Sequence, residues 1–339
     1  MSDNVGIVTV SDDLHACIIA TELKSRHGVN CSVFETDKIS FKGDFEWKPG
    51  LSDGSSYLTN NLRQRCEIES LTTFWWRRFA QEQAEIPIQG LPHERDLINK
   101  DCRAALSGMF DCLPEERFVS SRAATDRASN KLLQLRTALK HGLRIPQTLI
   151  SSNRAAILDF VNSQRSCILK PLGSTSKAIV FTTRVTGSEI SRGSVTASPA
   201  IYQECIEGSV HLRVNVFGEQ VYAFQIKAND LDWRRVLSTD VELVKLDSAL
   251  QKQLVAFVAE FGLSMGIIDM KVDPTGEPIF LEINPQGQFL FLEPLTGLNL
   301  IEIFADFLVG RAIAGKCAPN FKAVRRLSQP PSIAPAAMH

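Results

Sequence analysis

The sequence lacks a Cys-x-x-Cys pair, and its eight cysteines lie far apart among apolar neighbours. This spacing suits neither zinc ligation nor a disulfide framework, so we interpret the cysteines as reduced packing residues. An excess of charge of one sign is also lacking, because 37 Lys plus Arg face 38 Asp plus Glu. Binding to nucleic acid or to a membrane surface by bulk electrostatics is therefore not indicated, and any basic site must be local.

Long apolar runs are absent too, since none approaches the ~18 residues of a membrane span. The first residues, MSDNVGIVTVSDD, carry acids where a secretory signal carries basic residues. These two absences predict a cytoplasmic protein. The chain also has no Gly-x-x-x-x-Gly-Lys-Ser/Thr loop and no Gly-x-Ser-x-Gly elbow, which argues against a P-loop NTPase and against an α/β serine hydrolase.

The segments that are present predict an α/β (α+β) protein of two or three units, since 339 residues with 44% hydrophobic side chains supply ample core. Near the N-terminus, VGIVTV and CSVFET read as strands around a helix, with Asp12 or Asp13 as its N-cap and Gly28 as its stop. LTTFWWRRF follows as a strand and residues 93–113 as a helix. We expect an N-terminal α/β domain over residues 1–119.

A second unit is expected over residues 120–199, with a helix that Gly142 stops, a strand around Thr148 and a helix that Ser152 caps. From Ala200 the pattern favours strands, and IYQECI, VHLRVNVF and VYAFQIKA predict one antiparallel set. This third unit is expected to run over residues 200–315. The tail, residues 316–339, is rich in Pro and Ala and is expected to be disordered.

The hairpin pattern MGIIDMKVDPTGEPIFLEINPQGQ places acids within strands that otherwise read as buried. An unpaired buried carboxylate is costly, so Asp269, Glu282 and Asn284 need a shared partner. The turn DPTG brings the two strands together, and residues two apart share a face, so the three oxygen-bearing side chains can converge. Such a set suits Mg²⁺, which is typically shared with phosphates of a substrate. The alternative is a solvated rim of an ordinary hairpin.

Basic residues upstream favour a phosphate ligand. Lys131 begins one helix, and Lys170 ends the apolar strand CILK, where a lysine is poorly placed unless it meets an anion. The loop PLGSTS then supplies Gly173 for close backbone approach and the three hydroxyl groups of Ser174, Thr175 and Ser176. Loops of this composition are also common as plain turns.

The ordered strings CILKPLGSTS, YQECIEG, HLRVNVFG, DMKVD and FLEINP resemble the ATP-grasp ligases over about residues 130–308. The resemblance implies an ATP-grasp fold with an N-terminal pre-ATP-grasp domain, a small central domain and a C-terminal antiparallel-sheet domain. It implies ATP and two Mg²⁺ ions, with metal ligands Asp269, Glu282 and Asn284 and with Arg213 near the transferred phosphate. The implied nucleotide residues are Lys131, Lys170, Gly173, Ser174, Thr175, Ser176, Gln203, Glu204, Cys205, Ile206 and Glu207.

FWWRRF, AFQIKANDLDWRR and FLEINPQGQFLFLEPLTGLNL resemble, within that superfamily, the graspetide synthetases of microviridin type. Those enzymes join side-chain carboxylates to hydroxyls or amines in a ribosomal precursor peptide. The resemblance implies that Asp232, Trp233 and Arg234 position the peptide carboxylate, although Trp233 equally suits a core or interface position. The match departs from the common pattern at His211, where relatives usually carry an acid.

FWWRRF has a plainer interpretation as an edge strand that packs its tryptophans into a core and leaves Arg77 and Arg78 solvated. His15, His27, His93 and His141 lie in helical or polar contexts and are assigned no role.

We therefore expect an ATP-dependent ligase that activates a carboxylate as an acyl phosphate, with Lys170 and Arg213 stabilising the transfer. A precursor peptide is the expected partner, and a homodimer is the expected assembly. Two alternatives stay open. One is an amino-acid or peptide ligase of the glutamate-ligase or glutathione-synthetase type, and the other is a nucleotide-binding protein without turnover.

Overall fold

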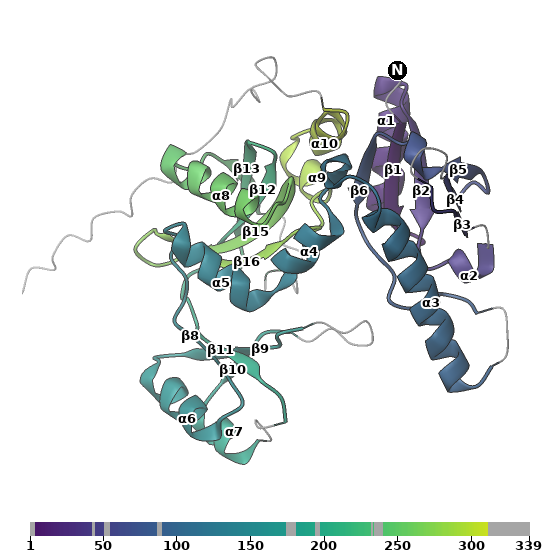
Figure 1. The fold of residues 1–339 in the computed structure, drawn as a ribbon. Coiled ribbons are helices and arrows are strands. Elements are labelled where there is room, and N and C mark those ends of the chain that lie inside the picture. The colour runs from purple at the N-terminus through teal and green to yellow at the C-terminus, as the bar shows by residue number, and fades with distance from the viewer. Residues whose placement is uncertain are drawn as a thin grey trace, which may run out of the picture.

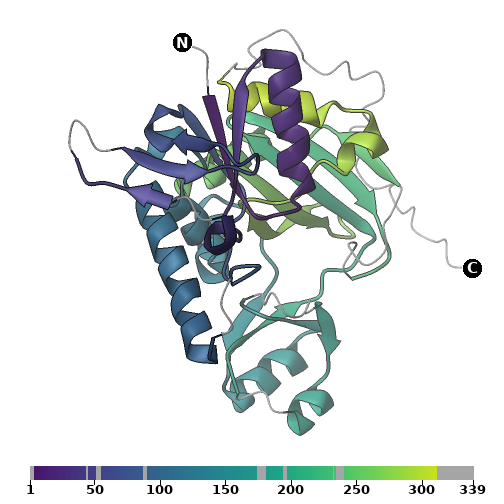
Figure 2. The same ribbon diagram turned by 90° about the vertical axis from the view of Figure 1, so that its right-hand side faces the viewer.

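A computed structural model describes residues 4–42, 45–50, 55–86, 90–173, 181–193, 197–231, 233 and 240–310. The chain forms three lobes, and the small middle lobe extends away from the other two (Figures 1 and 2). This architecture confirms the predicted mixed α/β class. The expected disordered tail, residues 316–339, lies outside the described residues.

The first lobe is built on a parallel sheet of order β2-β1-β6-β7, which comprises β1 (Asn4–Thr9), β2 (Asn30–Glu35), β6 (Thr73–Trp76) and β7 (Phe118–Val119). Helix α1 (Leu14–His27) joins the first two strands. Asp13 caps this helix by accepting from the backbone N–H of His15, and Gly28 ends it at φ 65°. The predicted cap and stop are both confirmed.

A second small sheet belongs to this lobe. Its order is β3-β4-β5, from β3 (Phe45–Trp47), β4 (Ser56–Thr59) and β5 (Arg65–Glu67). The strands have three or four residues each, too few for a two-residue alternation to be recognised. The remaining elements are α2 (Ile39–Lys42), α3 (Pro92–Asp111) and the 3₁₀ turns η1 (Ile68–Ser70) and η2 (Glu115–Arg117).

The small middle lobe has a sheet of order β10-β9-β11-β8, from β8 (Thr148–Ser151), β9 (Cys167–Lys170), β10 (Thr183–Val185) and β11 (Ala200–Glu204). It packs against α6 (Arg154–Ser163) and α7 (Gly187–Arg192). Two predictions are wrong here. Strand β11 belongs to this sheet and not to the following one, because Tyr202 packs against α6. Asn153, not Ser152, caps α6, since its side chain accepts from two backbone N–H groups of the first turn.

The third lobe is an antiparallel sheet of order β14-β13-β12-β15-β16, from β12 (Val210–Phe217), β13 (Gln220–Lys227), β14 (Val241–Val244), β15 (Met265–Val272) and β16 (Pro278–Asn284). One face packs against α4 (Arg122–Ser129), α5 (Lys131–Lys140) and α8 (Ser248–Glu260). The other face packs against α9 (Leu292–Thr296) and α10 (Leu300–Leu308).

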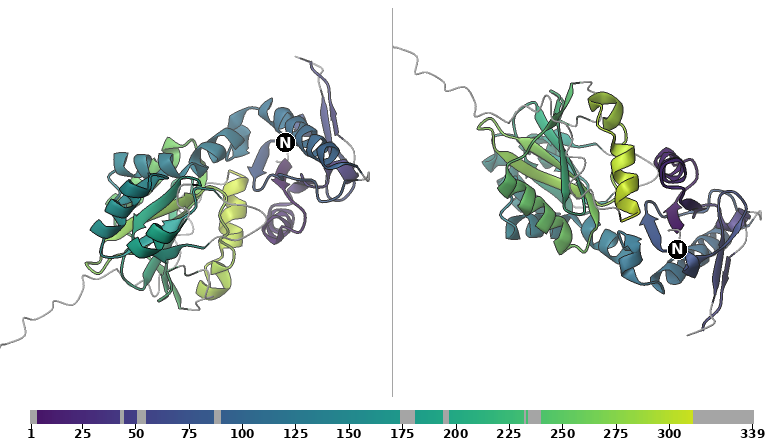
Figure 3. Two further views of the ribbon diagram at one scale, coloured as in Figure 1. Left: turned by 90° about the horizontal axis from the view of Figure 1, so that it is seen from below. Right: turned by 90° about the horizontal axis from the view of Figure 1, so that it is seen from above.

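Helix α10 also joins the first and third lobes. It lies between the large sheet and α1 in both views of Figure 3, and one hydrophobic core includes residues of all three. Helices α4 and α5 precede the middle lobe in the chain but pack on the large sheet. The expected domain limits at residues 119, 199 and 315 stay predictions. Within the described ranges, no helix combines the length and apolarity that a membrane span requires.

Candidate active site

The hairpin of β15 and β16 presents its acids on one face. Asp269 lies opposite Glu282, and Asn284 follows Glu282 by two residues and lies opposite Ile267. The side chains of Asp269, Glu282 and Asn284 therefore share one face of the hairpin. A register shift after Asp269 leaves Leu281 as an extra residue. On the neighbouring strand, Arg213 lies opposite Asp269. The sheet therefore places one arginine and three oxygen-bearing side chains along adjacent strands.

Both carboxylates already contact cationic side chains. The guanidinium Nη1 of Arg213 lies 2.8 and 2.9 Å from the two carboxylate oxygens of Asp269. The ammonium of Lys131 lies 2.6 Å from Oε2 of Glu282. Arg213 and Asp269 are both buried, so this first pair is shielded from solvent, while the second is partly exposed. Asn284 accepts at Oδ1 from the backbone N–H of Gln286 at 3.1 Å.

The donor chemistry of this face fits a hard divalent ion. Two carboxylates and an amide supply oxygen ligands, which Mg²⁺ prefers. Among the described residues no group of three His, Cys, Asp or Glu side chains could hold a metal ion, so the amide of Asn284 is needed to complete the set. An ion bound here would share Asp269 with Arg213 and Glu282 with Lys131, or displace those cations.

A cavity of about 570 Å³ opens beside this face, between the large sheet and the small middle lobe. Its volume is in the range of small-ligand sites. Most of the predicted site residues that the structure describes line it: Lys131, Lys170, Gly173, Gln203, Glu204, Ile206, Trp233, Asp269, Glu282 and Asn284. The structure thus brings together residues that are up to 153 positions apart in the chain, as counted from Lys131 to Asn284.

The wall formed by β9 and β11 is ordered by hydrogen bonds. The ammonium of Lys170 donates to Oε1 of Gln203 at 3.0 Å, and Nε2 of Gln203 donates to the hydroxyl of Thr148 at 2.9 Å. Gln203 is buried, so this chain of bonds fixes the direction in which Lys170 points. A cationic donor on the wall of the cavity suits an anionic ligand.

Three predicted residues do not line the cavity. The side chain of Cys205 is buried beside Cys167, and Glu207 lies near Arg165, with 3.6 Å between Nε and Oε1. Arg213 does not line the cavity itself, but its guanidinium donates to Asp269, which does.

Five further predicted residues lie outside the described residues: Ser174, Thr175, Ser176, Asp232 and Arg234. Their neighbour Trp233 is described. Its ring stacks on Phe291 with 5.8 Å between centroids, and the guanidinium of Arg213 lies 5.4 Å from the Trp233 ring. Trp233 therefore both lines the cavity and packs against an aromatic neighbour, which fits each of its two predicted interpretations.

Lys271 is a cavity residue that the motifs did not identify. It is buried, lies opposite His211 across the strands, and lines the cavity together with that histidine. Burial lowers the pKa of its ammonium, and among the described residues no side chain forms an ion pair with it. Its spacing of two from Asp269 was the available signal, because that spacing puts both on one face of β15.

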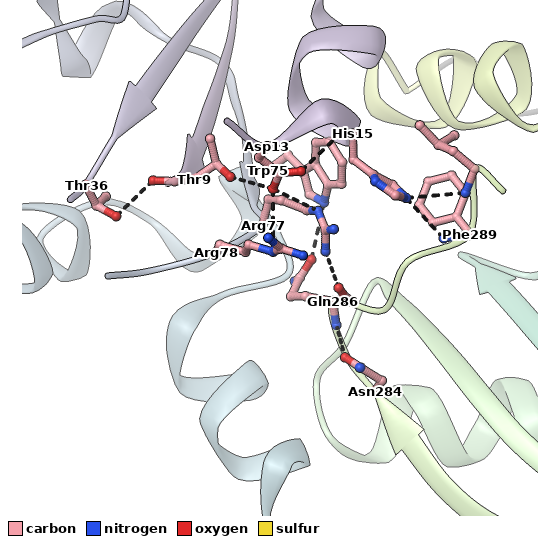
Figure 4. A network of polar contacts seen from close by, with 11 residues as sticks. Thr9, Asp13, His15, Thr36, Trp75, Arg77, Arg78, Asn284, Gln286 and Phe289 are labelled. Carbon is pink, nitrogen blue, oxygen red and sulfur yellow. Dashed lines mark hydrogen bonds and ion pairs between the residues drawn. The ribbon is translucent and has the colours of Figure 1, made fainter. Parts of the chain in front are cut away.

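A polar network connects the first lobe to the loop after β16 (Figure 4). Arg77 is 2% exposed, its Nε lies 3.4 Å from Oδ2 of Asp13, and its Nη1 donates to the backbone carbonyl of Gln286. The plainer interpretation of FWWRRF is therefore wrong for Arg77, and β6 is not an edge strand because it lies between β1 and β7. Both of its tryptophans, Trp75 and Trp76, are buried.

His15 has a structural role that the sequence did not reveal. Its Nε2 accepts from the backbone N–H groups of Phe289 and Leu290, each at 3.3 Å. Burial, together with the positive charges of Arg77 and Arg78, lowers the pKa of His15 to about 4, against the opposing effect of Asp13. The imidazole is thus neutral at physiological pH, and protonation at Nε2 would remove the acceptor.

This pKa predicts a loss of stability in mild acid. The unfolded chain binds a proton at His15 near the ordinary value of about 6.5, whereas the folded chain binds it only near 4. The contribution is therefore fully present above the unfolded value and is lost as the pH falls through this window. Urea unfolding at several pH values across this window gives the free energy of unfolding of the wild type and of His15→Gln. As the pH falls, this free energy should decrease less steeply in the variant. Parallel decreases would contradict the assignment.

Comparison with known proteins gives structural neighbours. No protein-family model matches the chain, and no curated protein does. Macrocyclase MdnC of Microcystis aeruginosa, solved with the precursor peptide MdnA, is 29% identical, with a TM-score of 0.80 over 90% of this chain and 99% of MdnC. Macrocyclase MdnB of the same organism is 26% identical, with a TM-score of 0.75 over 91% of this chain and 99% of MdnB.

A third neighbour bears on the fold alone. The RiPP-associated ATP-grasp ligase of Chryseobacterium gregarium, solved with ADP and with a leader and core peptide, is 23% identical. Its TM-score is 0.80 over 91% of this chain and 97% of that protein. These neighbours confirm the resemblance predicted from the motifs, and the fold is that of the ATP-grasp ligases.

Proposed function

We propose that this chain, whose fold is that of the ATP-grasp ligases, forms ester or amide crosslinks between side chains of a ribosomal precursor peptide. The observation that carries the proposal is the cavity in which Lys131, Lys170 and the face of Asp269, Glu282 and Asn284 meet. The likeness to the macrocyclases MdnC and MdnB over nearly their whole length supports the choice of a peptide substrate.

The predicted site residues divide by chemistry. We assign the nucleotide to Lys131, Lys170, Gln203, the backbone from 204 to 206 and the loop from 173 to 176, with Glu207 for the ribose. We assign two Mg²⁺ ions to Asp269, Glu282 and Asn284, where the ions would neutralise charge on phosphate oxygens. Asp232, Trp233 and Arg234 are assigned to the peptide carboxylate.

The reaction then needs two steps. The substrate carboxylate attacks the γ-phosphorus of ATP, so that a P–O bond forms, the bond to ADP breaks and an acyl phosphate results. A hydroxyl or amine of the same peptide attacks the acyl carbon, loses its proton and expels phosphate. Lys170 and Arg213 would stabilise the charge that develops during transfer.

Incubation with ATP, Mg²⁺ and candidate precursor peptides, followed by mass measurement, tests the proposal. One water should be lost from the peptide for each bond formed, with one ADP released. ADP release that requires only a free amino acid or a small peptide would identify an amino-acid ligase instead. Nucleotide binding without ADP release on any acceptor would identify a protein without turnover. A homodimer and a cytoplasmic location stay predictions.

A further inference from the structure

The loop of residues 285–290, which follows Asn284 and is here called the ligand loop, is held by side chains of two lobes. From the third lobe, Nη2 of Arg213 donates to the backbone carbonyl of Gln288 at 2.7 Å. From the first lobe, Arg77 donates to the backbone carbonyl of Gln286, and Nε1 of Trp75 donates to Oε1 of Gln286 at 3.3 Å. Figure 4 shows the contacts of Arg77 and Trp75 converging on Gln286, while His15 accepts from the backbone of Phe289 further along the same loop.

The same loop fixes the side chain of Asn284. The backbone N–H of Gln286 donates to Oδ1 of Asn284, so the position of Gln286 decides how the amide oxygen of Asn284 is directed. The loop also has little freedom to move toward the sheet. A Cβ at Gly287 would lie 2.7 Å from the Cβ of Ile267, which means that the backbone there is in close contact with β15.

Arg77 forms an ion pair with Asp13 in addition to its bond to the loop. Its partner Asp13 is buried, accepts from the hydroxyl of Thr9 at 2.7 Å and caps α1. The pKa of Asp13 is lowered because Arg77, Thr9 and Arg78 together outweigh the effect of burial. A buried arginine that lacked such partners would cost several kcal/mol. Arg77 thus connects Asp13, at the start of α1, to the backbone of Gln286.

We propose that Arg77 is a positioning residue for the metal site: by holding the ligand loop, it orients Asn284 and keeps the carbonyl that orients Arg213 in place. The inference rests on the proposed function and deepens it, because it makes the first lobe part of the catalytic geometry. The Asp13–Arg77–Gln286 connection acts on the ligands without touching the reacting atoms. Partners of this outer kind typically contribute 10- to 100-fold to metal affinity.

The test compares the binding of a non-hydrolysable ATP analogue with and without Mg²⁺ in Arg77→Met, Arg77→Lys and the wild type. Mg²⁺ should strengthen analogue binding in the wild type, and Arg77→Met should reduce that gain by roughly tenfold or more. Arg77→Lys keeps the charge and one donor nitrogen, so its gain in analogue binding from Mg²⁺ should lie between those of the wild type and of Arg77→Met. In assays of ADP release, the variants should need more Mg²⁺ for half-maximal rate yet approach the wild-type rate at saturation.

Arg95→Met is the matched control, because Arg95 belongs to the same lobe but lies exposed on α3, outside the network of Figure 4. It should leave the Mg²⁺ requirement unchanged. If the Arg77 variants do not fold, Trp75→Phe serves in their place, since it keeps an aromatic ring beside Phe304 but loses the donor to Gln286. It should raise the Mg²⁺ requirement in the same direction by a smaller factor.

The two possible failures differ. If the folded Arg77 or Trp75 variants keep the wild-type Mg²⁺ requirement, the positioning role is wrong while the ligase assignment stands. If the wild type shows no Mg²⁺-dependent binding of the analogue, the proposed function fails first.

Discussion

Glu282→Gln is expected to reduce ADP release by roughly 100-fold or more while the fold is kept. A glutamine has the shape of glutamate but lacks the charge that holds a divalent ion against phosphate, and removal of one such electrostatic group typically costs 10²–10³ in rate. The fold should survive because the Glu282 side chain is 30% exposed and its contact with Lys131 is partly solvated. A coupled assay of ADP release, with circular dichroism for folding, measures both quantities.

Glu277→Gln is the matched control for this result. Glu277 lies on the same hairpin but is exposed and outside the cavity, so its neutralisation should leave the rate unchanged. Asp269→Asn should also abolish turnover. It is the less clean variant, because it leaves the buried guanidinium of Arg213 without its carboxylate and should lower stability as well. A Glu282→Gln enzyme with normal ADP release would reject the metal assignment.

Lys170→Met is expected to weaken nucleotide binding by roughly 10- to 100-fold. A hydrogen bond from a charged donor contributes about 1.5–3 kcal/mol, and each 1.4 kcal/mol is about tenfold in affinity. Methionine preserves the unbranched apolar stem at the end of β9, so the loss should report the ammonium alone. Isothermal titration with ATP and Mg²⁺ gives the affinity directly.

Lys140→Met provides the comparison, since the ammonium of Lys140 contacts Glu260 on the surface at 2.7 Å, far from the cavity lining. Its ATP affinity should equal that of the wild type. An unchanged affinity in Lys170→Met would mean that the ammonium of Lys170 serves Gln203 only, and the nucleotide would have to be placed elsewhere in the cavity.

Much of the hairpin site could be predicted because its causes are local. Two strands joined by DPTG have a register that the turn fixes, and a two-residue alternation then decides which side chains share a face. Asn284 follows from the alternation, because it lies two residues after Glu282. Asp269 lies opposite Glu282 only because the register shifts at Leu281, which the sequence does not mark. The cap at Asp13 and the stop at Gly28 are equally local, because each acts on backbone groups of its own helix.

The features that could not be predicted depend on contacts between distant segments. The composition of β11 is compatible with pairing to β9 or to β12. Its place beside β9 depends on the packing of Tyr202 against α6, which is a contact between distant segments. Arg77 follows a strand and would ordinarily be solvated. It is buried because Asp13 and the carbonyl of Gln286, 64 positions before it and 209 after it, both reach its guanidinium.

Lys271 lies between these two cases. Its place on the face of Asp269 follows from spacing, but its burial in the cavity follows from the small middle lobe, whose β9 and β11 form the opposite wall. A lysine in a strand is ordinarily exposed, and nothing local marks this one as different.

The most direct measurement of the central claim is a crystal structure of the chain with Mg²⁺ and a non-hydrolysable ATP analogue. The polyphosphate should lie in the cavity beside Lys131 and Lys170, with Mg²⁺ bound between it and the oxygens of Asp269, Glu282 and Asn284. A nucleotide bound outside the cavity, or an ion held by other side chains, would contradict the account.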